Sequence, residues 1–416
     1  MEPLLRPVLN LADRLMEKSP EIATVVDPDE KVDITIGIAT FDDFDGAWFT
    51  INSLHLHHQD VMDRAEVVLL DNHPRGPESA ELKRFETQLP RVRYVPVSAY
   101  SSTAIRDQIF AHARGEVVVV LDSHVLLAPG ALNAVVEYLE GHPDSRDIVH
   151  GPMLGSDNRH NGATQMDPVW NAGMFGVWGS DDRADNLNAE PFEIAMQGLA
   201  AFACRRDVWP GLNPKFVGFG GEEGYVHEKF RRGGGRALCL PAFRWQHRFP
   251  RPRGVSYRLN WEDRVRNYAI GWSELGLDVD EMAEHFVEAT GTLRAPEIVE
   301  RVRRGIATDF WKADGVICVN DDLRPGLWNA TVAAFSEFGI VPMRVSRPDG
   351  DSVDDDLDAA RALLRELGWR SAVVVGERTA VTTDGVRSAD AVLAAGQSVL
   401  DDRAKLVSWI DREGVA

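Results

Sequence analysis

The chain has 416 residues, 44% of them hydrophobic, and carries a formal net charge of −20. This length exceeds the size at which a single hydrophobic core keeps growing, so we expect two domains. The acidic balance excludes a protein that coats nucleic acid without specificity, because phosphate contacts need clustered lysine and arginine.

Residues 1–31 begin with MEPLLRPVLNLADRLMEK, in which apolar residues recur at helical spacing but charges interrupt every stretch. A signal peptide or a membrane span needs an uninterrupted apolar core, so we expect a docking helix on a cytoplasmic protein with no membrane span. The cysteines, Cys204, Cys239 and Cys318, are too few and too scattered for a disulfide framework and fit a reducing compartment. We expect Cys204 and Cys239 to be buried and inert.

Residues 32–266 alternate short apolar runs with amphipathic segments. The predicted strands are 33–40, 65–72, 92–97 and 116–125, and the predicted helices are 48–58, 78–89 and 103–114. This alternation indicates βαβ units and an α/β fold with a mostly parallel, Rossmann-like sheet. Ligands bind beyond the carboxyl ends of such strands. The places to examine are Thr40 with Phe41, Asp71 with Asn72, and Asp122 to His124.

The run VVVVLDSHV predicts a buried central strand that ends in an acid and an imidazole. Asp122 and His124 are two residues apart on an extended chain, so their side chains point to the same side. A carboxylate and a neutral imidazole suit a divalent cation such as Mn²⁺. Taken alone, the motif leaves another interpretation open, in which the aspartate caps the next helix and the histidine only packs.

Residues 151–221 are rich in Gly, Asn, Trp and Met and show weak periodicity, which is typical of substrate loops. The segment then continues as GFGGEE, where glycines allow backbone to approach a ligand and Glu222 and Glu223 stand at a predicted helix start. His247 follows the strand-like ALCLPAFRW. Each feature alone also fits a glycine turn, a capping acid and a partly exposed histidine.

Together, the order and spacing of these motifs over about residues 32–260 resemble the GT-A glycosyltransferases, especially the polypeptide N-acetylgalactosaminyltransferase branch. The resemblance implies that Asp122, His124 and His247 bind Mn²⁺, or Mg²⁺, against the diphosphate of a nucleotide sugar, with a UDP sugar as the expected donor. It also implies that Gly198 lies near the transferred sugar, that Glu222 accepts hydrogen bonds from its hydroxyls, and that the transfer retains anomeric configuration.

The sequence departs from that branch at Phe219, where the family has tryptophan, and at Glu223, where it has asparagine. These departures leave the identity of the hexose open. The membrane anchor, disulfides and lectin domain of the eukaryotic members are not found in this sequence, so the resemblance does not supply the acceptor.

Further roles are predicted for residues around these motifs. Asp71 is expected to bind the ribose or base of the nucleotide, and Arg106 to help position it. Arg248, or Arg251 or Arg253, is expected to stabilise charge on the departing phosphate. No residue stands out as a dedicated nucleophile. The predicted donor-site residues are Thr40, Phe41, Asp71, Arg106, Gly198 and Gly221, and the predicted catalytic residues are Glu222, Glu223 and Arg248.

The segment 229–266 is rich in arginine within an otherwise acidic chain, which would focus positive potential on an anionic ligand. Two acceptor hydroxyls stand out: one on a protein serine or threonine, suggested by the resemblance, and one on a hydroxymethylated base in DNA, suggested by these arginines. Small-molecule and cell-envelope glycan acceptors stay open. A DNA acceptor predicts a steep loss of activity with salt. Two other functions stay open: a sugar-nucleotide hydrolase or nucleotidyltransferase, and a binding module without turnover.

The rest of the chain predicts a helical connection over 267–309 and a small α/β accessory domain over 310–416, with the boundary near Asp309 and oligomeric state open. Asp354 to Asp356 are expected to begin a helix, where acids favour its dipole. The cluster His55, His57 and His58 is expected to be structural. Trp170, Trp178 and Trp209 are predicted to be either core residues or an acceptor platform.

Overall fold

The structure is a computed structural model that describes residues 31–98, 102–250, 254, 257, 259–320, 326–346, 353–376, 387–388 and 406–411. The predicted docking helix over 1–31 therefore lies outside the described residues except for Lys31, as do Arg251 and Arg253. None of the described helices is both long enough and apolar enough to cross a membrane.

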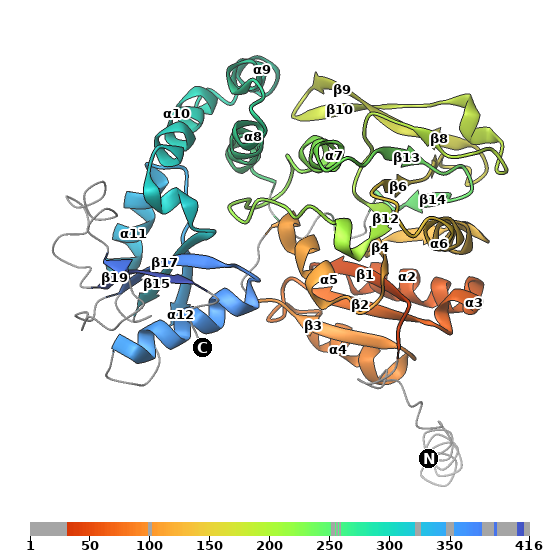
Figure 1. Ribbon diagram of the computed structural model, residues 1–416, viewed down its shortest axis with the longest axis horizontal. Helices are drawn as coiled ribbons and strands as arrows, with labels where there is room; N and C mark the ends of the chain where they lie inside the picture. The colour runs from red at the N-terminus through yellow and green to blue at the C-terminus, as the bar shows by residue number, and fades with distance from the viewer. Residues whose placement is uncertain are drawn as a thin grey trace, which may run out of the picture.

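The main sheet has eight described strands in the order β11-β13-β6-β12-β4-β1-β2-β3 (Figure 1). The pairs within β4-β1-β2-β3 are parallel, and so is β13 with β6, whereas β12 runs antiparallel to both of its neighbours. The predicted α/β class with a mostly parallel sheet is confirmed. The strands are β1 (Ile34–Thr40), β2 (Ala65–Asp71), β3 (Val92–Pro96), β4 (Val117–Asp122), β6 (Ile148–His150), β11 (Phe192–Glu193), β12 (Ala201–Arg205) and β13 (Ala237–Cys239).

Helices cover both faces of this sheet because its central strands are apolar on both sides. Along β2, Val67 and Leu69 belong to the core under one face and Val68 and Leu70 to the core under the other. The first face packs against α2 (Phe44–His57), α3 (Gln59–Met62), α4 (Ser79–Gln88) and α6 (Ala131–Gly141). The second packs against η1 (Thr103–Ile105), α5 (Arg106–His112), α7 (Glu223–Arg232) and α8 (Trp261–Leu275).

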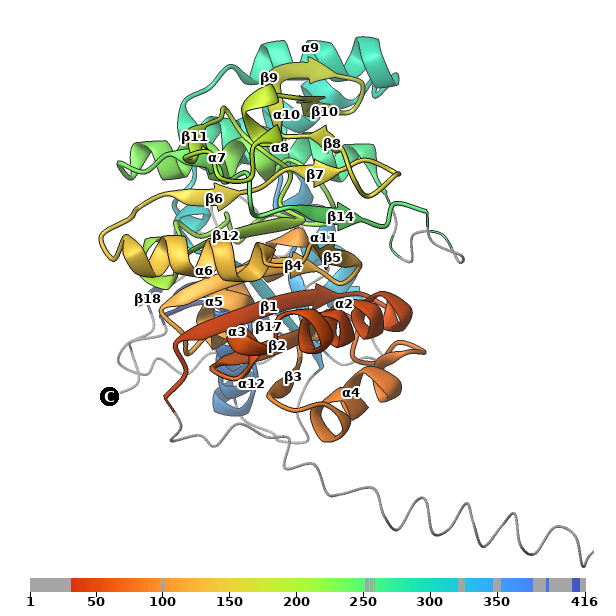
Figure 2. The same cartoon turned by 90° about the vertical axis from the view of Figure 1, so that its right-hand side faces the viewer.

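The predicted strand 116–125 is two strands. β4 ends at Asp122, a turn carries Ser123 and His124, and β5 then joins a second sheet in the order β5-β14-β7-β8. Figure 2 shows β14, β7 and β8 on the β4 side of the main sheet. The strands of this second sheet are β5 (Val125–Leu127), β7 (Met153–Leu154), β8 (Asn161–Ala163) and β14 (Trp245–His247).

The region 151–221 is more regular than predicted. It contributes β7, β8, β11 and β12, and the hairpin of β9 (Gln165–Asn171) and β10 (Met174–Gly179), with the short turns η2 (Asp182–Asp185) and η3 (Arg206–Val208). β12 lies against β4 in the centre of the main sheet. These strands were not predicted because they are short and no helix separates them. Neither the two-residue period of a strand nor the 3.6-residue period of a helix is sustained long enough to be detected.

The predicted helical stretch after Arg266 begins earlier, at Trp261, because the Asn260 side chain caps α8. It continues as α9 (Val279–Thr290), α10 (Ala295–Ile306) and η4 (Asp309–Lys312). A separate sheet follows in the order β16-β15-β17-β19-β18. We call residues 313–411 the C-terminal unit; it contains β15 (Gly315–Asn320), α11 (Gly326–Ser336), β16 (Met343–Ser346), α12 (Val353–Glu366), β17 (Ser371–Gly376), β18 (Arg387–Ser388) and β19 (Leu406–Asp411).

Candidate metal centre

A cavity of about 480 Å³ opens where β1, β2 and β4 end, at the edge that the strand pattern predicted. We call it the strand-end cavity. Of the predicted donor-site residues, Thr40, Phe41 and Arg106 line it, together with Asp122 and His124. Its other lining residues are Ala39, Asp43, Asn72, Ser102, Thr103, Ile105, Ser123, Val217, Gly218, Phe219, Tyr257, Asp263 and Val341.

Asp122, His124 and His247 converge at one side of this cavity, with one ligand atom of each residue within 4.8 Å of the others. Nε2 of His124 lies 3.1 Å from Nε2 of His247, which lies 3.7 Å from a carboxylate oxygen of Asp122. The convergence arises because β14, which carries His247, pairs with β5 directly after the Asp-Ser-His turn. His124 and His247 are 123 positions apart in the sequence, yet their imidazoles and the Asp122 carboxylate face one point.

Asp43 orients the first of these imidazoles. Its carboxylate lies 2.7 Å from Nδ1 of His124 and accepts a hydrogen bond of 2.8 Å from the Ser123 hydroxyl. It also caps α2 by accepting from Gly46 N. A proton on Nδ1 leaves Nε2 of His124 as the lone-pair nitrogen that faces His247, which is the arrangement of metal-binding histidines. Asp43 was not predicted from the sequence, although FDDFD places an acid at a helix start just after the first strand.

Arg106 holds the carboxylate of the cluster. Its guanidinium donates to Asp122 at 2.8 Å and lies 3.8 Å from Glu222. Burial opposes the charge of the guanidinium, but the two carboxylates hold the pKa of Arg106 above its ordinary value. Burial would likewise raise the pKa of Asp122, but Arg106 and His247 hold it well below its ordinary value. Arg106 thus keeps Asp122 ionised. We had predicted that Arg106 positions the nucleotide and had not predicted its contact with Asp122.

The GFGGEE segment approaches the cluster from the other side of Arg106. Gly220 and Gly221 have φ of 99° and 97°, and a Cβ on Gly220 would lie 2.4 Å from Nε of Arg264, so both positions require glycine. Glu222 is buried, and its Oε2 has no hydrogen-bond partner within the described residues. Burial and the neighbouring Glu222 raise the pKa of Glu223 to about 7.

Asp71 does not line the strand-end cavity. Its carboxylate is fully buried and accepts hydrogen bonds from the Tyr94 hydroxyl at 2.7 Å and from His73 N at 2.9 Å. Burial raises the pKa of Asp71. The next residue, Asn72, lines the cavity instead. Asp71 therefore supports the loop behind Asn72 rather than facing the space where we predicted it to bind a nucleotide.

Aromatic rings form one wall of the cavity. Phe41 stacks on His73 with ring centroids 4.7 Å apart, and Phe219 stacks on Tyr257 at 5.6 Å. Phe41 and Tyr257 also meet edge to face. His73 and Tyr257 were not predicted from the sequence, because their contacts join segments that no short motif connects. The wall suits a flat ring such as a nucleobase.

A second cavity of about 800 Å³ lies on the other side of the histidines, and His124 lines both cavities. We call it the outer groove. It contains His247 and Arg248, and three of its aromatic side chains are exposed: Phe49, Trp178 and Phe249. Its other lining residues are Gly46, Thr50, Leu126, Met153, Leu154, Gly155, Ser156, Gly162, Ala163, Gln246 and Pro250. No carboxylate of the described residues is among them.

Trp178 connects the outer groove to Gly198, because a Cβ on that glycine would lie 2.9 Å from the Trp178 ring. The other two tryptophans pack elsewhere. Trp170 contacts Tyr268 and Trp272, and Trp209 stacks on Phe110.

Several described arginines of segment 229–266 pair with acids or donate to backbone carbonyls of the chain. Arg231 and Arg232 pair with Glu228 on their own helix, and Arg236 pairs with Asp147 at 2.8 Å. Arg264 and Arg266 donate to backbone carbonyls of Gly173 and Lys215. These five arginines are therefore engaged within the chain, whereas Arg251, Arg253 and Arg258 lie outside the described residues.

Two remaining predictions concern cysteines and a histidine cluster. Cys204 and Cys239 are buried and free, and burial raises the pKa of both thiols, as expected for inert cysteines. His55, His57 and His58 stand at the end of α2, where desolvation lowers the pKa of His55 and His58. None of the three is among the groups that gather to hold a metal within the described residues.

Comparison with known proteins matches residues 35–208 to the model of Glycosyl transferase family 2. The match includes Asp122 and His124 and ends before Glu222 and His247. This part of the chain is therefore similar to that family, and it contains β1 to β4 and β12 of the observed main sheet. No curated protein matches the sequence.

Several solved structures resemble the chain at low sequence identity. A crystal structure of GalNAc-T7 with UDP, GalNAc and Mn²⁺ has 15% identity and a TM-score of 0.46, covering 63% of this chain and 55% of that one. The chain thus spans about half the length of that protein. The mannosyltransferase PcManGT from Pyrobaculum calidifontis, in complex with GDP-Man and Mn²⁺, has 16% identity and a TM-score of 0.40, covering 87% and 93%. Residues 1–349 of S. aureus TarS with UDP-GlcNAc have 14% identity and a TM-score of 0.40, covering 74% and 90%.

Proposed function

We propose that the protein is a metal-dependent glycosyltransferase of the GT-A type that moves a sugar from a nucleotide sugar, with a UDP sugar as the expected donor, to an acceptor hydroxyl. The observation that carries the proposal is the convergence of Asp122, His124 and His247 between two cavities, at the end of a strand within the family-matched region. The buried thiols of Cys204 and Cys239 are consistent with the cytoplasmic location included in this proposal.

The residues present fit a divalent cation. One carboxylate and two imidazoles are a mixed oxygen and nitrogen donor set suited to Mn²⁺, with Mg²⁺ as the alternative. When bound, such an ion supplies Lewis-acid neutralisation of a diphosphate leaving group. Asp43 fixes the His124 tautomer and Arg106 keeps Asp122 ionised, so the protein prepares the donor atoms in advance.

We place the nucleotide in the strand-end cavity, with its base against the aromatic wall of Phe41 and Tyr257. The transferred sugar would lie toward Glu222, whose unpartnered Oε2 can accept a hydrogen bond from a sugar hydroxyl. Arg248, which lines the outer groove beside His247, can approach the departing phosphate. By the resemblance to the polypeptide N-acetylgalactosaminyltransferase branch, the transfer retains anomeric configuration.

The acceptor would enter through the outer groove, which reaches the same histidines from the opposite side. The groove is apolar and aromatic and has Arg248 as its cation among the described lining residues. A hydroxyl on a protein serine or threonine fits such a lining better than a hydroxymethylated base in DNA, whose phosphates need several cations. Activity should therefore depend weakly on salt, whereas a DNA acceptor requires a steep dependence.

Two alternatives remain from the sequence. A sugar-nucleotide hydrolase or nucleotidyltransferase needs the same metal but no acceptor, and a binding module needs no second cavity. The outer groove favours a transferase because it brings a second ligand to the metal cluster. Product analysis separates these functions: free sugar alone indicates hydrolysis, and transfer requires a glycosylated acceptor.

The deciding experiment is calorimetric titration of UDP, GDP and several UDP sugars into the purified chain, with and without Mn²⁺. We expect metal-dependent binding that His247→Ala abolishes. Wild-type transfer that persists in excess EDTA would refute the metal assignment. Absence of binding with every donor would refute the donor assignment.

A further inference from the structure

One residue of the strand-end cavity comes from a distant part of the chain. Val341 lies between α11 and β16 of the C-terminal unit, whereas the other lining residues fall between positions 39 and 263. Its apolar side chain is 46% exposed. An exposed valine at the mouth of a cavity leaves apolar surface available to a ligand.

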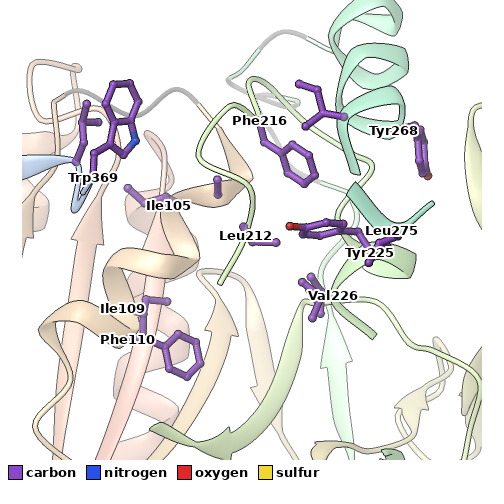
Figure 3. Packing of buried hydrophobic residues seen from close by; sticks show 14 of the residues in the cluster. Ile105, Ile109, Phe110, Leu212, Phe216, Tyr225, Val226, Tyr268, Leu275 and Trp369 are labelled. Carbon is purple, nitrogen blue, oxygen red and sulfur yellow. The ribbon is translucent and has the colours of Figure 1, made fainter. Parts of the chain in front are cut away.

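The C-terminal unit is fixed against the element that forms one wall of the cavity. Arg106 at the start of α5 lines the cavity, and Gln108 of the same helix donates to the carbonyl of Leu367 at 2.8 Å in a buried hydrogen bond. Ile105 and Trp369 belong to one hydrophobic cluster that crosses between the two parts (Figure 3). The wall and the C-terminal unit therefore share a packed interface.

A neighbouring segment of the cavity wall, in which the carbonyl of Gly218 accepts a hydrogen bond from Thr103 N, is held in the same way. Val217 to Phe219 line the cavity, and Lys215, two residues earlier, donates to the carbonyl of Ala313 at 2.6 Å. The Lys215 ammonium also lies 5.2 Å from the centre of the Trp311 ring. These two sets of contacts fix where the C-terminal unit stands, and with it the position of Val341.

We propose that the C-terminal unit is part of the donor site and that Val341 contacts the bound nucleoside diphosphate. This inference rests on the proposed function and extends it, because it gives a substrate-binding role to a unit that the sequence analysis left without one. Val341 supplies apolar contact at the mouth of the cavity while the loop of Val217 to Phe219 and the start of α5 supply the walls.

The test uses the full chain with Val341→Asp and Val341→Ala, and Val169→Asp as a matched control. Val169 lies on β9, is 51% exposed and does not line the cavity. Because both valines are exposed, none of the substitutions should lower the thermal midpoint appreciably. We expect Val341→Ala to weaken UDP binding in Mn²⁺ about threefold. Val341→Asp should weaken it at least about tenfold, because its carboxylate would stand near a diphosphate.

Calorimetry with UDP and with GDP distinguishes the outcomes. Loss of affinity in Val341→Asp, with Val169→Asp unchanged, supports the inference. Equal affinity of Val341→Asp and the wild-type chain overturns it and leaves the proposed function standing. If the wild-type chain binds neither nucleotide in Mn²⁺, both the proposed function and this inference fail.

Discussion

Nε2 of His124 and Nε2 of His247 face each other at 3.1 Å, with the two rings nearly perpendicular. Asp43 accepts from the opposite nitrogen of His124, so the nitrogen that faces His247 carries a lone pair. Nδ1 of His247 has no partner within the described residues. Two imidazole nitrogens at this distance are bridged either by one shared proton or by one bound cation. The nearby Asp122 carboxylate favours the cation, because it adds a third donor atom.

Asp43→Asn should weaken Mn²⁺ binding about 10- to 100-fold without unfolding the protein. Asparagine keeps the ability to cap α2, but its amide cannot reproduce the carboxylate that accepts from both Ser123 and His124. Calorimetry with Mn²⁺ measures the loss. Asp45→Asn is the control, since Asp45 is an exposed acid in the first turn of the same helix. Equal losses in the two variants would argue against a specific role for Asp43.

His247→Ala and Asp122→Ala should both abolish transfer but should differ in stability. When the His247 side chain is removed, every described hydrogen-bond donor around it keeps a partner. Removing Asp122 takes away the closest acceptor of the buried Arg106 guanidinium and leaves Glu222, at 3.8 Å, as the carboxylate beside it, with the Thr103 carbonyl at 3.3 Å. Loss of one member of such a pair costs about 3 kcal/mol. Urea unfolding should therefore show a large decrease for Asp122→Ala and a small one for His247→Ala, and the reverse order would contradict this account of Arg106.

The sequence predicted the parts of the site that lie within one motif or at the end of one strand. The Asp-Ser-His turn was predicted because a run of valines ends abruptly in polar residues. Asp71 was misplaced because position at a strand end does not reveal which side chain turns inward; the hydroxyl of Tyr94 on β3 decides that. Asp43, His73 and Tyr257 were missed for a related reason, since their contacts join segments far apart in sequence. β12 was missed because five residues are too few to establish a period.

Glu223→Gln should change how stability depends on pH. Burial and the adjacent Glu222 raise the pKa of Glu223 from 4.5 to about 7. A carboxyl whose pKa is raised by folding contributes stability that is present below about 4.5 and is lost as pH rises through about 7. From pH 5 to pH 8 the wild-type chain should lose about 2 kcal/mol more of its unfolding free energy than the variant.

Denaturant unfolding at both pH values measures the difference. Glu281→Gln is the control, because Glu281 is an exposed acid in the first turn of α9. If the unfolding free energy of Glu223→Gln falls between pH 5 and pH 8 as much as that of the wild-type chain, the carboxyl of Glu223 does not cause this pH dependence.

Phe49→Ala tests whether the outer groove receives the acceptor. Phe49 lines the groove and is 55% exposed, so its truncation removes ligand contact without opening a hole in the core. Loss of one aromatic contact should raise the KM for the acceptor about five- to tenfold while leaving the Kd for the nucleotide sugar unchanged. Initial rates at saturating donor, with the acceptor that supports turnover, give the KM.

Leu56→Ala is the control, since Leu56 is 76% exposed on the same helix but does not line the groove. A change in donor affinity instead would mean that the sugar nucleotide extends into the groove, and an unchanged KM would mean that the acceptor approaches the histidines by another route.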